Sequence, residues 1–178
     1  MFELLFTKVL VIHIISVMIA VGTVTVTDYL HILGLRNPKL ERQTLFVFPH
    51  LSNLIRLALL AIYITGTMMV LARPEILSSP LFWVKLTLVG IVTVNGFILH
   101  HVIFPRIEKG IKKKQYSTQL IRIAAFGGSL SVISWYGIVV LALTKNVGYT
   151  PLTFILFYIL AAAIAYIVAV HIETQKIK

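Results

Sequence analysis

Residues 4–33 read LLFTKVLVIHIISVMIAVGTVTVTDYLHIL, an apolar stretch that is long enough to cross the hydrocarbon core of a bilayer as one helix. Four further stretches of the same kind follow, at about 46–71, 81–104, 120–143 and 152–171. Each is continuously apolar, whereas the strands of a membrane barrel alternate apolar and polar residues over about ten positions. The sequence therefore predicts an all-α integral membrane bundle of five transmembrane helices, with residues 1–178 forming a single domain.

Composition narrows the class of protein and the chemistry available to it. Hydrophobic residues make up 58% of the 178 residues and charged residues 12%, which excludes an ordinary soluble domain. The chain has no cysteine, so disulfides, thiolate ligands, iron–sulfur clusters and covalently attached c-type haem are excluded. A bound metal ion or haem would therefore take its ligands from histidine, methionine, carboxylate or tyrosine side chains.

The distribution of cations predicts the orientation of the helices. Eleven of the sixteen lysines and arginines flank one end of the predicted bundle: Arg36, Lys39, Arg42, Arg106, Lys109, Lys112, Lys113, Lys114, Arg122, Lys176 and Lys178. The opposite end carries only Lys8, Arg73, Lys85 and Lys145. By the positive-inside rule we expect the N-terminus outside and the C-terminus in the cytoplasm of a prokaryotic plasma membrane. Because the charges flank the helices, they indicate contact with the lipid bilayer and not with nucleic acid.

Five of the six histidines lie at the predicted cytoplasmic ends of the helices. They are His31, His50, His100, His101 and His171. Imidazole ligates haem iron and many metal ions, so two of these residues are candidate haem ligands near this face. The candidate ligands for a metal ion are Asp28, His31, His50, His100 and His171. The alternative is that the histidines are ordinary interfacial residues.

Helix geometry restricts how these residues can act together. Adjacent residues point about 100° apart on a helix, so only one of His100 and His101 is expected to face inward. Asp28 lies one turn before His31 and is expected to orient that imidazole or to join a metal site. Arg56, in the second helix, is the expected ion-pair partner of Asp28 if the first two helices pack antiparallel.

His13 is set apart by its depth, about 13 Å into the first helix from its outer end, where an unpaired imidazole is costly. At a comparable depth the second helix brings Met68 and Met69, and the third brings Lys85. Methionine sulfur completes the coordination of haem iron opposite histidine in some cytochromes, so His13 with Met68 or Met69 is a candidate axial pair. The alternative is that both methionines are ordinary membrane residues and that Lys85 extends to the outer interface.

Three short landmarks resemble a known family. They are His13-Ile-Ile-Ser-Val in the first helix, Ile64-Thr65-Gly66 in the second, and the run LFWVKLTLV at 81–89 in the third. This pattern resembles HemJ-type protoporphyrinogen oxidases and the related CopD-type copper-resistance membrane proteins. The resemblance covers the first three helices. It implies a compact bundle that binds haem b and oxidises a porphyrinogen, with His13 and Lys85 important and Lys85 catalytic.

These observations predict a membrane protein that binds one or two haem b groups and has a redox or electron-transfer role linked to a quinone or a porphyrin. Such a protein could be a haem-dependent membrane oxidoreductase. The first alternative is a transporter or other membrane protein that handles copper or another divalent metal ion. The second is a membrane anchor or assembly subunit, working with other membrane subunits or as a homo-oligomer.

Overall fold

A computed structural model of the chain describes residues 2–36, 38–113, 118–144 and 150–174. Within these ranges the structure is helical and contains no strand, as predicted. The long helices are α1 (Phe2–Arg36), α2 (Pro38–Ala72), α3 (Pro80–Ile98), α5 (Thr118–Leu143) and α6 (Pro151–Thr174). The prediction of five helices long and apolar enough to cross a membrane is confirmed, while the orientation of the termini stays a prediction.

The third span is continuous through three helical types. α3 passes into a π-helical turn, η2 (Leu99–Ile103), and then into α4 (Phe104–Lys113). Pro105 lies two residues after the end of this turn, and a proline has no N–H to bond to the carbonyl four residues earlier. The wider π turn is the local adjustment that lets the chain continue as a helix through the proline. The span therefore reaches Lys109, beyond the predicted end at residue 104.

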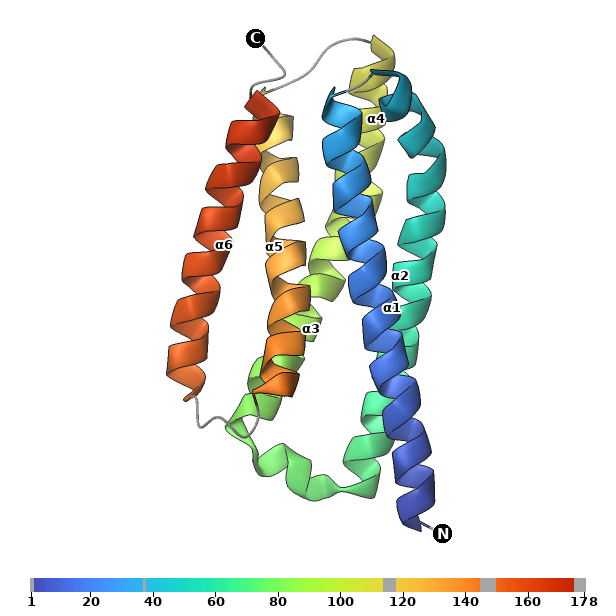
Figure 1. The fold of residues 1–178 in the computed structure, drawn as a ribbon, viewed down its shortest axis with the longest axis vertical. Helices are drawn as coiled ribbons and strands as arrows, with labels where there is room; N and C mark the ends of the chain where they lie inside the picture. Colours follow the sequence, from blue (N-terminus) through green and yellow to red (C-terminus); the bar gives the residue numbers. More distant parts are fainter. Residues whose placement is uncertain (1, 37, 114–117, 145–149, 175–178) are drawn as a thin grey trace.

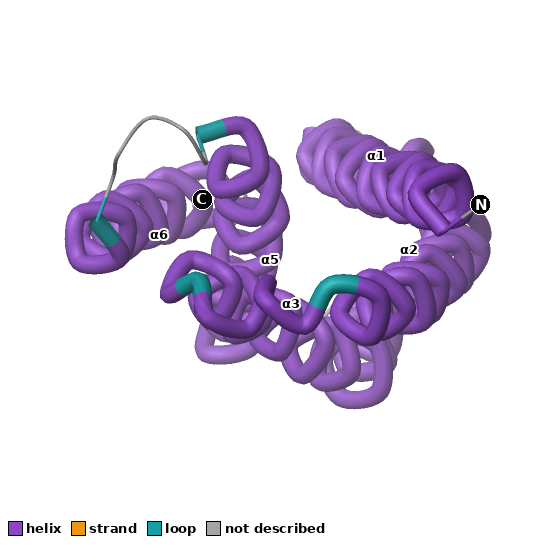
Figure 2. The backbone as a smooth tube through the Cα atoms, turned by 90° about the horizontal axis from the view of Figure 1, so that it is seen from below, coloured by secondary structure: helices purple, strands orange, loops and turns teal. Residues whose placement is uncertain are grey.

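The helices form two groups in cross-section. α1 packs along α2, whereas α5 packs against both α3 and α6 (Figures 1 and 2). α2 is joined to α3 by the short 3-10 helix η1 (Pro74–Ser78). Small residues at the α1–α2 contact, Ala20 and Ala58, are buried, and small side chains let two membrane helices approach closely.

Polar bonds between helices add to this packing. Asn95 Nδ2 on α3 donates to the Gly127 carbonyl on α5 at 2.8 Å, and Ser134 on α5 and Tyr158 on α6 are hydrogen-bonded at 2.8 Å. The outward surface is apolar: of the apolar window in α6, no residue is buried inside the protein. That surface suits contact with lipid tails, which is where apolar side chains of a membrane helix are stable.

Candidate functional site

His13 is held against α2 by a hydrogen bond to Thr65. The two atoms, His13 Nδ1 and Thr65 Oγ1, lie 2.8 Å apart. The Thr65 hydroxyl donates its own proton to the backbone carbonyl of Ala61 at 2.6 Å, so its oxygen is left to accept from the imidazole. This accounting places the imidazole proton on Nδ1. Nε2 therefore keeps its lone pair, which is the form in which histidine acts as a metal or haem ligand.

Two further residues complete the surroundings of this imidazole. A Cβ added at Gly66 would lie 3.6 Å from His13 Cε1, an ordinary van der Waals contact, so the imidazole lies beside Gly66 on α2. Lys85, on α3, lies close enough to His13 for its charge to act on the imidazole. The structure thus gives His13 a hydrogen-bond partner, Thr65, and relates it to Lys85, the other residue singled out from the sequence, through the charge of the lysine. We call His13, Thr65, Gly66 and Lys85 the His13 centre.

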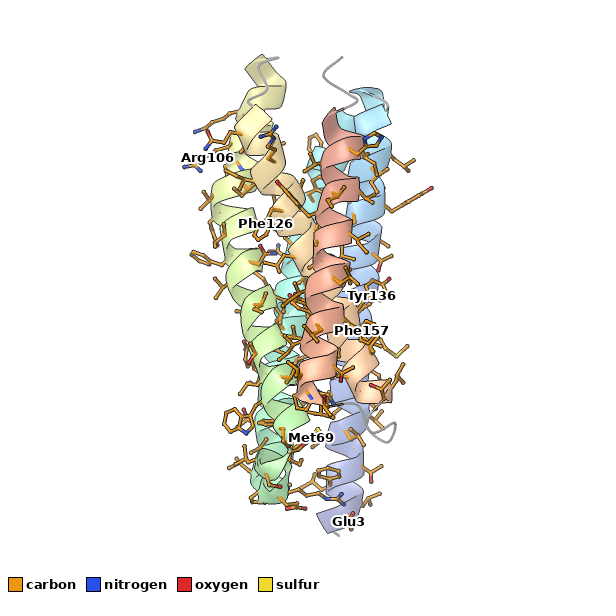
Figure 3. The ribbon with its side chains drawn as sticks, turned by 90° about the vertical axis from the view of Figure 1, so that its left-hand side faces the viewer. Glu3, Met69, Arg106, Phe126, Tyr136 and Phe157 are labelled. Carbon is orange, nitrogen blue, oxygen red and sulfur yellow. The ribbon has the colours of Figure 1, made fainter. Side chains whose placement is uncertain are left out.

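The predicted methionine partners lie one helical turn from Thr65 toward the Ala72 end of α2. Met69, four residues after Thr65, shares its face of the helix and is half-buried, whereas Met68 is exposed. Figure 3 places Met69 in the same half of the bundle as Glu3. Met69 is therefore the methionine of the pair that is nearer to the packed side of α2. The pairing of His13 with either methionine stays a prediction.

At the opposite end, Asp28 does not form the ion pair that we expected. Arg56 donates to Asn53 Oδ1 on its own helix, and its charge acts on His100. Among the described residues, Asp28 Oδ2 is buried and has no hydrogen-bond partner. His31, one turn later on α1, lies close enough to interact with the carboxylate electrostatically. The expectation of an Asp28–Arg56 pair was wrong, because the Arg56 guanidinium bonds instead to Asn53 on its own helix.

His100 and His101 both lie in the π turn η2 and differ in exposure, as helix geometry requires. His100 is half-buried, whereas His101 is exposed and contacts Phe97 of its own span, with 4.5 Å between the tilted ring centres. The two imidazoles meet edge to face at 4.8 Å. His100 is thus the member of the pair that faces the bundle, and a π turn at such a position is a common feature of functional sites.

The remaining histidines are not gathered around His100. His50 is exposed on α2, next to Pro49. His171 is exposed near the end of α6, and α6 lies across α5 from α1 and α2 (Figure 2). In the described parts of the chain, no group of three or more histidine, aspartate or glutamate side chains is placed to hold a metal ion. The five predicted metal ligands, Asp28, His31, His50, His100 and His171, therefore do not form one assembled site here.

Thr65 is the hydrogen-bond partner of His13 that sequence reasoning missed. It stands within Ile64-Thr65-Gly66, at the depth of His13, and was considered as part of that landmark. The usable signal was a hydroxyl beside a glycine on the neighbouring helix, because an imidazole within a membrane needs a hydrogen-bond partner.

Comparison of the chain with protein-family models, with curated proteins and with solved structures finds no match. The resemblance to the HemJ and CopD families therefore stays a prediction that depends on the residues quoted for it.

Proposed function

We propose that this chain is a membrane haem b protein with a redox role, and that His13 is a ligand of the haem iron. The observation that carries the proposal is the hydrogen bond from His13 Nδ1 to Thr65 Oγ1, at 2.8 Å. A histidine ligand of a metal commonly donates its second ring N–H to a fixed acceptor, which sets the tautomer and the ring orientation. Thr65 supplies that acceptor from the neighbouring helix.

The donor set around His13 fits a haem group. Nε2 offers a neutral nitrogen lone pair, and Lys85 brings a positive charge close to the imidazole. Porphyrins carry carboxylate side chains, and a lysine ammonium binds a carboxylate through charge-assisted hydrogen bonds. When bound, haem iron supplies one-electron redox chemistry with a quinone or porphyrin substrate. The chain's own part is to hold Nε2 in one orientation through Thr65 and to balance carboxylate charge through Lys85.

The test is the absorption spectrum of the full chain purified from haem-supplied cells. We expect a Soret band that sharpens on reduction, and we expect His13→Ala to lose it. The matched control is Ile14→Ala, which changes the next residue of α1, an exposed one at 48%. A colourless protein that takes up no added haem contradicts the proposal, as does a His13→Ala variant that keeps the full Soret band.

A second candidate function, handling of copper or another divalent cation, is favoured by a different observation. Asp28 Oδ2 is buried without a hydrogen-bond partner among the described residues, and a carboxylate in this state binds a cation or a proton favourably. Uptake of copper or zinc ions into vesicles that contain the purified chain tests this candidate. It requires Asp28→Asn to abolish uptake while His13→Ala leaves it intact, and unchanged uptake by Asp28→Asn rules it out.

A further inference from the structure

A groove between α5 and α6 is independent of the His13 centre. It has a volume of about 520 Å³, within the usual range of about 300–1,000 Å³ for ligand sites. The residues that line it include Gln119, Arg122, Phe126, Ala162, Ala163 and Tyr166. Figure 3 places Phe126 in the same half of the bundle as Arg106, away from Glu3. The groove therefore opens on the surface near the cation-rich end of the bundle.

The walls of the groove are shaped for a hydrocarbon chain. Ala162 and Ala163 present only methyl groups on the α6 side, so the space between the helices is not filled by side chains. Phe126 and Tyr166 meet edge to face across it, with 5.9 Å between ring centres. Apolar and aromatic walls of this kind bind an acyl chain through the same contacts that bind lipid tails elsewhere on the bundle.

One end of the groove carries polar side chains, in contrast to its apolar walls. Arg122 is exposed and begins the membrane span of α5, which puts its guanidinium at the depth of the lipid headgroups. Gln119 lies one turn before it, on the same helical face. A guanidinium forms paired hydrogen bonds with a phosphate, and the amide of a glutamine can donate one more.

We propose that this groove binds one anionic phospholipid, with its phosphate on Arg122 and Gln119 and an acyl chain along Phe126, Ala162 and Ala163. Charge complementarity selects this occupant: Arg122, Arg106 and Lys109 are all exposed at this end of the bundle, and the lining contains no acidic residue. A neutral quinone fits the apolar walls but gives the guanidinium no counter-charge. Haem binding at His13 and lipid binding in this groove are separate properties, so an experiment can refute either one without refuting the other.

The experiment is native mass spectrometry of the full chain, titrated with phosphatidylglycerol or with phosphatidylcholine of the same acyl chains. We expect one phosphatidylglycerol molecule to bind more tightly than phosphatidylcholine. Arg122→Gln should weaken phosphatidylglycerol binding about fivefold, the change expected for one arginine near an anionic headgroup, and should weaken phosphatidylcholine less, because its choline cation offsets the charge of the same phosphate. The matched control, Arg106→Gln, removes an exposed arginine that does not line the groove and should retain the selectivity. Ala163→Leu fills the groove and should weaken both lipids.

Three results would overturn the proposal. Equal losses in Arg122→Gln and Arg106→Gln would mean that the selectivity comes from diffuse charge and not from the groove. An Ala163→Leu variant that binds both lipids normally would place the lipid elsewhere on the surface. Binding of a quinone analogue that displaces phosphatidylglycerol and is unaffected by Arg122→Gln would make the occupant an uncharged lipid.

Discussion

The Thr65→Val variant tests the geometry of the His13 centre most directly. Valine has nearly the shape of threonine but offers no hydrogen-bonding oxygen. In the protein, Thr65 Oγ1 accepts from His13 Nδ1 at 2.8 Å and donates to the Ala61 carbonyl at 2.6 Å. The variant removes both bonds while keeping the packing volume at this buried position, where threonine is only 6% exposed.

The expected loss of stability is small, and the expected loss of ligand affinity is larger. Hydrogen bonds between membrane helices contribute about 0.6 kcal/mol on average and at most about 1.7 kcal/mol. We therefore expect the free energy of unfolding to fall by about 1 kcal/mol. Haem affinity should fall about 10- to 100-fold, because loss of the group that orients a histidine ligand has an effect of this size on metal sites.

Two measurements separate these effects. Unfolding in mixed detergent micelles gives the free energy of unfolding, and titration of the apoprotein with haem at the Soret band gives the affinity. Thr65→Ser keeps the hydroxyl and should bind haem like the wild type, and Thr67→Val changes an exposed threonine two residues away as a control. If Thr65→Val binds haem with wild-type affinity, Thr65 does not orient the His13 ligand, and the argument from the tautomer is wrong.

Three further variants test other parts of the structure. Gly127→Ala places a Cβ 2.7 Å from Leu99 Cδ2 at the contact between η2 and α5, so we expect a loss of about 1–3 kcal/mol in the free energy of unfolding. Leu99→Ala in the same chain should restore part of it, and no loss would mean that this contact is loose. Glu3→Gln breaks the 2.7 Å ion pair between Glu3, whose side chain is 76% exposed, and Arg73, whose side chain is 38% exposed. The free energy of unfolding should therefore change by less than about 1 kcal/mol, and a larger change would contradict this expectation. Asp28→Asn removes a buried carboxylate whose Oδ2 has no partner among the described residues, so stability should rise by about 1 kcal/mol, whereas a fall would show that the charge is compensated.

The membrane class and the five spans could be predicted because they depend on local properties. A stretch such as residues 4–33 must be a helix in lipid, since only a helix satisfies all of its backbone groups within one segment. The extension of the third span through Pro105 was missed. A proline is read as a helix end, and the π turn that accommodates it depends on the surrounding helix.

The partners of the candidate residues could not be predicted, because they depend on how each helix is rotated about its own axis. α1 is apolar on all sides, so no polar stripe indicates which face meets α2 and which meets lipid. Comparison of depths along the helices indicated Met68 and Met69 as partners of His13. Its hydrogen-bond partner is Thr65, which lies one turn away from them on α2. The same uncertainty made Arg56 a plausible partner for Asp28, although Arg56 instead bonds to Asn53 on its own helix.

The two groups of helices give the His13 centre a position that matters for its proposed role. α1 packs on α2, while α3 and α6 pack on α5. A shared apolar core joins the two groups, together with polar bonds such as Thr25 to Tyr136 and Tyr63 to Thr93, both 2.9 Å. His13 belongs to the first group and Lys85 to the second. A ligand held by both residues would join the two groups, and a ligand at 100 times its dissociation constant stabilises the folded state by about 2.7 kcal/mol. A ligand that bound His13 alone would stabilise the wild type and Lys85→Ala equally. If the stabilisation is lost in Lys85→Ala, the centre spans both groups of helices; if it is kept, the centre is confined to α1 and α2.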